Sequence, residues 1–311
     1  MVVSFTTFSQ QFLNALQWGS FYALIALGYT MVYGVLLLIN FAHGDIFMVG
    51  AYLGYFIATF ITGLAISGVI ALPSWLVFVL TMLLSMIGTA GVGVTIERVA
   101  YRPLRRKGAG RLYLVITALM IGILLEYLNL SLLGARRRNF PELISREAFT
   151  IGGVNVTNIK VMVIGVSILV MILLELIVRR TKVGMAMRAI SYDRFVVPLM
   201  GVPVDRIIVM TFIIGSSMAA VAGVLYGTAY PILSYNMGIL IGWKAFIAAV
   251  VGGIGEIRGA MFGGYLLGFV EIFVAALFPS TLRDLIAFTV LLLILTIRPT
   301  GLFGVPRRQK V

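Results

Sequence analysis

Two short polar breaks between apolar runs, at 39 to 45 and 251 to 259, hold most of the side chains that could line or gate a passage. The candidate residues in these breaks are Asn40, His43, Asp45, Gly252, Gly253 and Gly255. In each break an apolar run meets polar residues and then continues into a glycine-rich helix, a pattern typical of inverted repeats that place broken helices at a transport pathway. His43 and Asp45 could also form a gate or a pH-sensitive pair, although such a pair at a turn is more often local capping.

Glu271 and Glu126 are two carboxylates inside apolar runs. A charged side chain facing lipid costs roughly 2.5–3.5 kcal/mol on insertion scales, so Glu271 either faces a water-filled pathway or forms hydrogen bonds at a helix interface. Both interpretations stay open. Hydrogen bonding between helices is the favoured interpretation of Glu126, because Asn129 and Ser131 follow it closely.

Enzymatic sites have little to be built from in this chain. With one histidine and no cysteine, a metal site or a Ser-His-Asp hydrolase would depend on His43 alone. No Gly-Lys dipeptide occurs, so a P-loop is absent and the chain cannot hydrolyse ATP by that motif. We therefore expect no enzyme activity and no cofactor in this chain.

Composition indicates an all-α polytopic membrane protein, because 61% of the residues are hydrophobic, 11% are charged and the mean hydropathy is +1.08. We expect about eight full transmembrane helices and one short, Gly-broken element at 243 to 257. The full spans are expected at 12 to 38, 46 to 66, 75 to 97, 112 to 134, 160 to 178, 207 to 230, 260 to 278 and 283 to 297. We expect them to form a single transmembrane domain, 1 to 311, with an inverted repeat as one interpretation of the two breaks.

Basic residues predict the orientation of the chain in the membrane. Most of the 24 Lys and Arg lie in 98 to 111, 179 to 206 and the tail 298 to 311, which the positive-inside rule places in the cytoplasm. The N-terminus is then outside, and Lys244 falls among the cations assigned to the outside. We expect a multi-pass protein of a bacterial or archaeal cytoplasmic membrane.

The basic segment 179 to 206 is a polar stretch between two apolar spans. Within it, the pattern of Met185 to Met200 largely predicts a short amphipathic helix. The expected polar side consists of Arg188, Asp193 and Arg194, and the expected apolar side consists of Ala186, Ala189 and Ile190. A short helix offered to the cytoplasm is predicted to dock into a groove on a partner.

Several strings along almost the whole chain resemble the permease subunits of branched-chain amino acid ABC importers, more closely the H-type than the M-type subunit. The most specific strings are Asn40-Phe-Ala-His-Gly44 and Arg298-Pro-Thr-Gly-Leu-Phe-Gly304, and the others are 23 to 34, 251 to 255 and 263 to 271. The resemblance implies ATPase coupling through Gly184, Arg188, Ala189, Asp193, Arg194, Met200 and Gly201. The chain departs from the family pattern at Phe195 to Pro198, where Pro198 would end the docking helix about one turn early.

The resemblance also implies a mechanism and partners. An external binding protein would deliver an amino acid, two ABC ATPase subunits holding ATP and Mg would close, and a second permease subunit, more often different than identical, would complete the channel. Substrate would then move by alternating access. Two alternatives stay open for this sequence: a gradient-driven secondary carrier, and a passive channel or structural membrane subunit. Urea and short amides are alternative substrates, since relatives in this family carry them.

Overall fold

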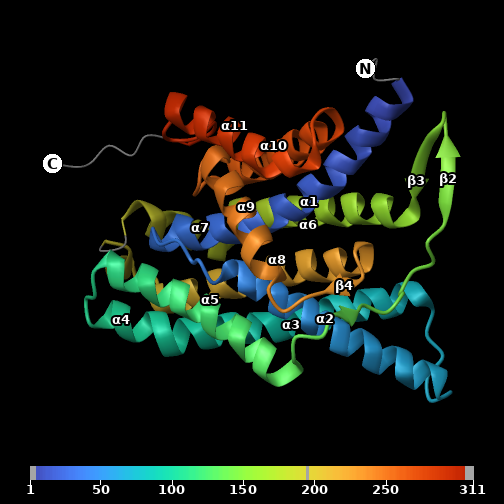
Figure 1. The fold of residues 1–311 in the computed structure, drawn as a ribbon. Coiled ribbons are helices and arrows are strands. Elements are labelled where there is room, and N and C mark those ends of the chain that lie inside the picture. Colours follow the sequence, from blue (N-terminus) through green and yellow to red (C-terminus); the bar gives the residue numbers. More distant parts are fainter. Residues whose placement is uncertain (1–4, 194–195, 305–311) are drawn as a thin grey trace.

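The computed structural model describes residues 5–193 and 196–304, and it is a bundle of helices (Figure 1). Within the described residues, seven helices are long and apolar enough to cross a membrane. They are α1 (Phe5–Leu36), α2 (His43–Ile66), α3 (Ser74–Ile96) extended by a π-helical turn (Glu97–Tyr101) and α4 (Arg102–Arg106), α5 (Arg111–Leu133), α6 (Asn158–Arg180), α8 (Val204–Ala229) and α10 (Ile257–Leu277). The prediction of an all-α polytopic membrane protein is confirmed.

Two shorter apolar helices complete the bundle. The helix expected at 283 to 297 has these bounds as α11 (Arg283–Ile297), but its 15 residues are few for a full span. At 1.5 Å per residue it is about 22 Å long, less than the roughly 30 Å hydrocarbon core. The predicted Gly-broken element is α9 (Met237–Gly252), a continuous 16-residue helix. Its glycines at 253 and 255 follow the helix instead of interrupting it.

Helices α1 and α8 form the centre of the bundle, with 83% and 78% of their most apolar windows buried. Small residues let the neighbouring backbones approach them closely. A Cβ added at Gly264 of α10 would lie 2.4 Å from Cα of Ala23 in α1, and one at Gly50 of α2 would lie 2.7 Å from Cα of Ala220 in α8. Larger residues at these glycines would therefore push the central helices apart.

The two ends of the bundle differ in structure. The end on the left of Figure 1, which we call the basic end, carries α4 and α7 (Lys182–Tyr192). The other end carries a hairpin of β2 (Ala148–Ile151) and β3 (Val154–Thr157), paired antiparallel with Ala148 opposite Thr157. A second short antiparallel pair joins β1 (Arg138–Asn139) to β4 (Ile232–Leu233).

Candidate functional site

Helix α7 begins directly after α6, because Thr181 caps its first turn. The Thr181 hydroxyl accepts a hydrogen bond from the Gly184 backbone N–H at 3.1 Å. A Cβ on Gly184 would lie 2.5 Å from the Ile177 carbonyl oxygen, so only glycine lets α7 turn back so tightly against α6. Arg188 adds a further link by donating to the Val178 carbonyl. The segment between the spans is thus held firmly against the end of α6.

The orientation of α7 corrects the predicted apolar docking side. Ile190 is only 3% exposed and, with Met187, packs against the bundle, whereas Ala189 is exposed. Ile190 therefore cannot enter a partner's groove. The large apolar side chains that the basic end does expose here are Met185, Tyr192, Val196, Leu199 and Met200.

The docking helix is also shorter than predicted. It ends at Tyr192, and Asp193 is its C-cap. Pro198 lies in a separate 3-10 turn, η2 (Val197–Met200), so the helix stops well before the proline that was expected to end it. Gly201 follows η2 with φ of +77°, a conformation that favours glycine. Arg194 lies outside the described residues, and the coupling role of the segment stays a prediction.

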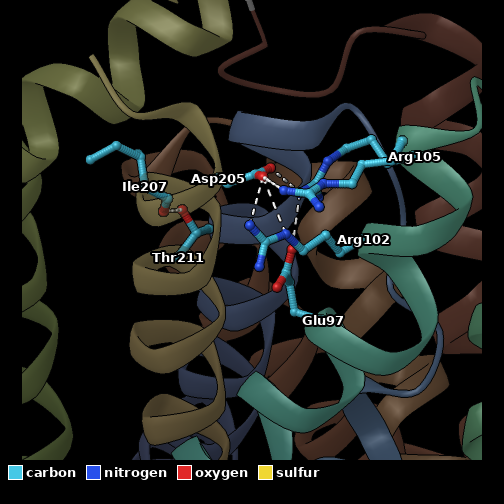
Figure 2. A network of polar contacts seen from close by, with 7 residues as sticks. Glu97, Arg102, Arg105, Asp205, Ile207 and Thr211 are labelled. Atoms are coloured by element: carbon cyan, nitrogen blue, oxygen red, sulfur yellow. Dashed lines mark hydrogen bonds and ion pairs between the residues drawn. The ribbon is translucent and has the colours of Figure 1, made fainter. Parts of the chain in front are cut away.

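A network of charges that the sequence did not reveal joins α3, α4 and α8 at the basic end (Figure 2). Asp205 accepts hydrogen bonds from Arg102 at 2.9 Å, Arg105 at 2.8 Å and Arg106 at 3.0 Å. Arg105 also contacts the fully buried Glu97 at 3.0 Å. Because Asp205 stands about 100 residues from its partners, no local pattern could have paired them.

The first break places its three polar candidates within the bundle, where all three are buried. Asn40 accepts a hydrogen bond from the Tyr101 hydroxyl at 2.8 Å, and the His43 ring packs edge-on to Tyr29 at 4.9 Å between centroids. Among the described residues, Asn40 Nδ2, His43 Nε2 and Asp45 Oδ1 have no hydrogen-bond partner. Buried polar atoms rarely stay unpaired, so each of these atoms calls for an explanation.

Beside this break lies a cavity of about 160 Å³, formed where α2, α5 and α9 meet. Asp45 and Glu126 line it from α2 and α5, so the structure brings together two carboxylates that the sequence had treated separately. Phe41 and Trp243, whose ring centroids are 5.3 Å apart, form an aromatic wall. At its edge α2 and α9 approach closely, because Gly44 of α2 packs directly against Gly238 and Gly242 of α9.

The second break follows the C-terminal end of α9, whereas the first packs near its N-terminal end, at Gly238 and Gly242. Gly253 and Gly255 have φ of +112° and +99°, and they turn the chain from α9 into α10. The backbone of the later segment 301 to 304 seals this turn: Leu302 N–H donates to Val251 at 2.8 Å and Phe303 N–H donates to Gly252 at 3.0 Å. The structure therefore does not bring the glycine candidates and the polar candidates into one site.

Glu271 is 3% exposed and forms part of a buried ion cluster. Its carboxylate lies 2.6 Å from Lys244 Nζ and accepts a hydrogen bond from the Tyr22 hydroxyl at 2.7 Å. Lys244 also contacts Asp284 at 2.8 Å, and Asp284 contacts Arg283. Lys244, which the sequence assigned to the outside, is a 2% exposed residue of α9, so its charge belongs to this buried cluster and not to a solvated loop. A lysine inside an apolar run was the signal that could have found this cluster.

Comparison with known proteins gives a family for this arrangement. The family model for the branched-chain amino acid transport system / permease component matches residues 11–295. The high-affinity branched-chain amino acid transport system permease protein BraD of Pseudomonas aeruginosa is 43% identical over 307 residues, 97% of each chain. The LivH permease proteins of Salmonella typhimurium and Escherichia coli K12 are 39% and 38% identical over the full length of both chains.

Among solved structures, PsaBC from Streptococcus pneumoniae in complex with Fab aligns with 92% of this chain and 91% of its own, at 15% identity and a TM-score of 0.46. The sequence relationships are far closer. A family match over most of the length and curated relatives of about 40% identity agree, and this chain belongs to the family of branched-chain amino acid transport system permease components.

Proposed function

We propose that this chain is the membrane-spanning permease subunit of an ATP-driven ABC importer for branched-chain amino acids. Its nearly full-length similarity to high-affinity branched-chain amino acid permease proteins supports this assignment. The sequence has no P-loop lysine motif, so the motor is supplied by partners. The complete importer contains two ABC ATPase subunits, a second permease subunit and an external binding protein.

The proposed orientation puts the basic end in the cytoplasm, the C-terminus inside and the N-terminus outside. Helices α4 and α7 lie together at this end (Figure 1), and their arginines and lysines fit the excess of cations in cytoplasmic loops. The membrane is the cytoplasmic membrane of a bacterium or archaeon.

Helix α7 is the observation that carries the coupling role. It stands outside the membrane-length helices, and it contacts α1, α6 and α8. Its inner face, Met187 and Ile190, is packed into the bundle, while Ala189, Met185 and Tyr192 are exposed. A partner that moves the exposed face therefore moves the inner face too, and the central helices α1 and α8 receive the displacement directly.

Substitution of Ala189 by Asp tests this coupling role. The change puts an unpaired charge into the docking contact and is expected to cost several kcal/mol of docking free energy, while the spans are untouched. We expect the variant to insert and pair with the second permease subunit, to lose the ATPase subunits on purification, and to lose ATP-driven uptake of leucine.

The matched control is Ala135→Asp, the same change at an exposed alanine near the hairpin end, which should retain the ATPases and uptake. Ile190→Asp should instead reduce the amount of folded protein, because that residue faces the bundle. Uptake that persists without ATPases and follows an ion gradient would refute the proposal and favour a secondary carrier.

A further inference from the structure

The cavity between α2, α5 and α9 contains an acidic side chain that lacks a partner. Asp45 is 7% exposed, and its Oδ1 has no hydrogen-bond partner among the described residues. A buried carboxylate oxygen without a donor is costly unless a donor arrives from outside. Asp45 Oδ1 therefore calls for a group that donates a hydrogen bond.

The chemistry of the lining indicates what kind of donor fits. Glu126 supplies a second carboxylate, and Tyr29, Phe41 and Trp243 supply aromatic rings. Carboxylates attract a cation, and aromatic faces add cation–π attraction together with apolar contact. The combination suits an organic ammonium that carries a short hydrocarbon group, and it disfavours an anion.

The size of the cavity agrees with such a ligand. Its volume is about 160 Å³, and an apolar protein cavity of about 150 Å³ is large enough to admit benzene. Gly122 keeps the space next to Asp45 open, because a Cβ there would lie 2.6 Å from Asp45 Oδ2. The site therefore has room for a branched aliphatic group of four or so carbons beside the ammonium.

The mouth of the cavity lies on the face formed by α5 and α9. Ile123 and Trp243, which line it, are 48% and 45% exposed in this chain. Ionisable side chains inside a membrane protein face a protein interior or a water-filled cavity, because facing lipid is costly. The two carboxylates thus indicate that this face borders water or another subunit, and an aqueous passage there would let a charged ligand reach Asp45.

We propose that this cavity is a transit site for the ammonium group of the transported amino acid, with Asp45 and Glu126 as its counter-charges and the aromatic wall beside the side chain. The proposal rests on the proposed importer function. It places part of the substrate selectivity in the permease itself, and it runs the translocation pathway along α5 and α9.

Equilibrium binding to the purified full chain in lipid nanodiscs tests the chemistry of the site. Three probes share one hydrocarbon group: L-leucine, isopentylamine, which lacks the carboxylate, and 4-methylpentanoate, which lacks the ammonium. We expect leucine and isopentylamine to bind and 4-methylpentanoate to bind at least tenfold more weakly. Asp45→Asn should weaken both amines at least tenfold, and Glu142→Gln, an exposed carboxylate elsewhere, should change nothing.

Accessibility provides an independent readout in the complete importer. The chain has no cysteine, so labelling of a single cysteine at Ile123 by a cationic thiol reagent can be followed on this chain once it is separated from its partners by denaturing electrophoresis. Leucine should slow that labelling when Asp45 is present, and it should not slow it when Asp45 is replaced by Asn. A variant that unfolds would be recognised by a changed size-exclusion profile, and Gly122→Ala, which crowds the carboxylate without removing it, would then replace Asp45→Asn.

The outcomes separate this proposal from the proposed function. Leucine uptake at the wild-type rate in Asp45→Asn, or equal binding of 4-methylpentanoate and isopentylamine, would overturn the ammonium site and leave the importer function standing. Conversely, binding of isopentylamine that depends on Asp45, in an importer that takes up no amino acid, would refute the importer's assigned substrate and retain the cation site.

Discussion

The two breaks look alike in the sequence and differ in structure. The first, between α1 and α2, adjoins a cavity and holds buried polar atoms of Asn40, His43 and Asp45 that have no partner in the part of the chain that the structure describes. The second, between α9 and α10, is closed by backbone hydrogen bonds from Leu302 and Phe303. Polar residues and glycines between apolar runs therefore do not by themselves mark a site. An open break has buried polar atoms without hydrogen-bond partners, whereas in a sealed break the backbone carbonyls are paired.

Glycine also has a different task in each break. Gly253 has φ of +112° and makes the turn that α10 requires. In the first break Gly44 is already helical, and it serves the close approach of α2 to Gly238 of α9. The second break thus stabilises a turn, whereas the glycine of the first creates a close helix contact beside the cavity. We expect substitution of Gly253 to lower stability and substitution of Asp45 to weaken binding.

Lys244 anchors α9, the helix that lies between the two breaks. Its substitution should lower thermal stability the most. Lys244→Met would leave Glu271 buried and without its counter-charge, at a cost of about 3–5 kcal/mol. The side chains of the two residues are 3% and 4% exposed, so solvent cannot replace the lost partner. We expect a large fall in Tm and in the yield of folded protein, measured by thermal unfolding and size exclusion.

The double variant Lys244→Met with Glu271→Gln is the control for this prediction. It removes both charges, and Asp284 keeps its contact with Arg283, so stability should recover most of the way. A double variant as unstable as the single one would show that the ion pair is not what anchors α9. If Lys244→Met instead has normal stability and altered uptake, the predicted role of Glu271 in lining the pathway would be supported.

A side chain on the turning glycine should have the next largest effect. Gly253→Ala forces alanine into a positive φ, at about 1–2 kcal/mol, and its Cβ would lie 2.5 Å from Gly304 N, at about 1–3 kcal/mol for overpacking. Gly34→Ala is the matched control, because a Cβ there meets nothing closer than 3.6 Å. Thermal unfolding should separate the two, and equal Tm values would contradict the assignment of a sealed, glycine-dependent turn.

The fold was predictable to the extent that it depends on apolar run length. Runs of about 20 residues identified the long helices, because lipid demands continuous apolar helix. The length of α11 was also visible in the sequence, because Arg283 and Asp284 begin its run and Arg298 and Pro299 follow it, and the predicted bounds 283 to 297 are those of the helix. The β2–β3 hairpin was missed although it carries a local signal: Gly152 and Gly153 form its turn with φ of +58° and +82°, and apolar residues alternate with small or polar ones on both sides, at Phe149, Ile151, Val154 and Val156.

The candidate site was predictable only in part, because its geometry depends on distant contacts. Asn40, His43 and Asp45 stood out as polar residues in an apolar context, yet nothing in the sequence paired Asp45 with Glu126 of α5. The same limit applied to Asp205 and its arginines. Ile190 was assigned to the wrong face of α7 because amphipathic spacing separates two faces without saying which of them meets the bundle.

The smallest of these effects is expected from loosening the first break. Tyr101→Phe removes the hydroxyl that donates to Asn40 at 2.8 Å, and Asn40 is 1% exposed, so its amide oxygen would be left without that donor. The cost is about 1–3 kcal/mol, and Tm should fall modestly. Tyr113→Phe is the control, because Tyr113 is 64% exposed. Hydrogen exchange should locate the change. The amide of His43, which donates to the Asn40 carbonyl at 3.0 Å, should exchange faster in Tyr101→Phe, while the amides of Leu302 and Phe303, which donate to Val251 and Gly252, keep their protection. Equal loss of protection in both breaks would mean that they open together through α9, and the distinction between an open break and a sealed one would fail.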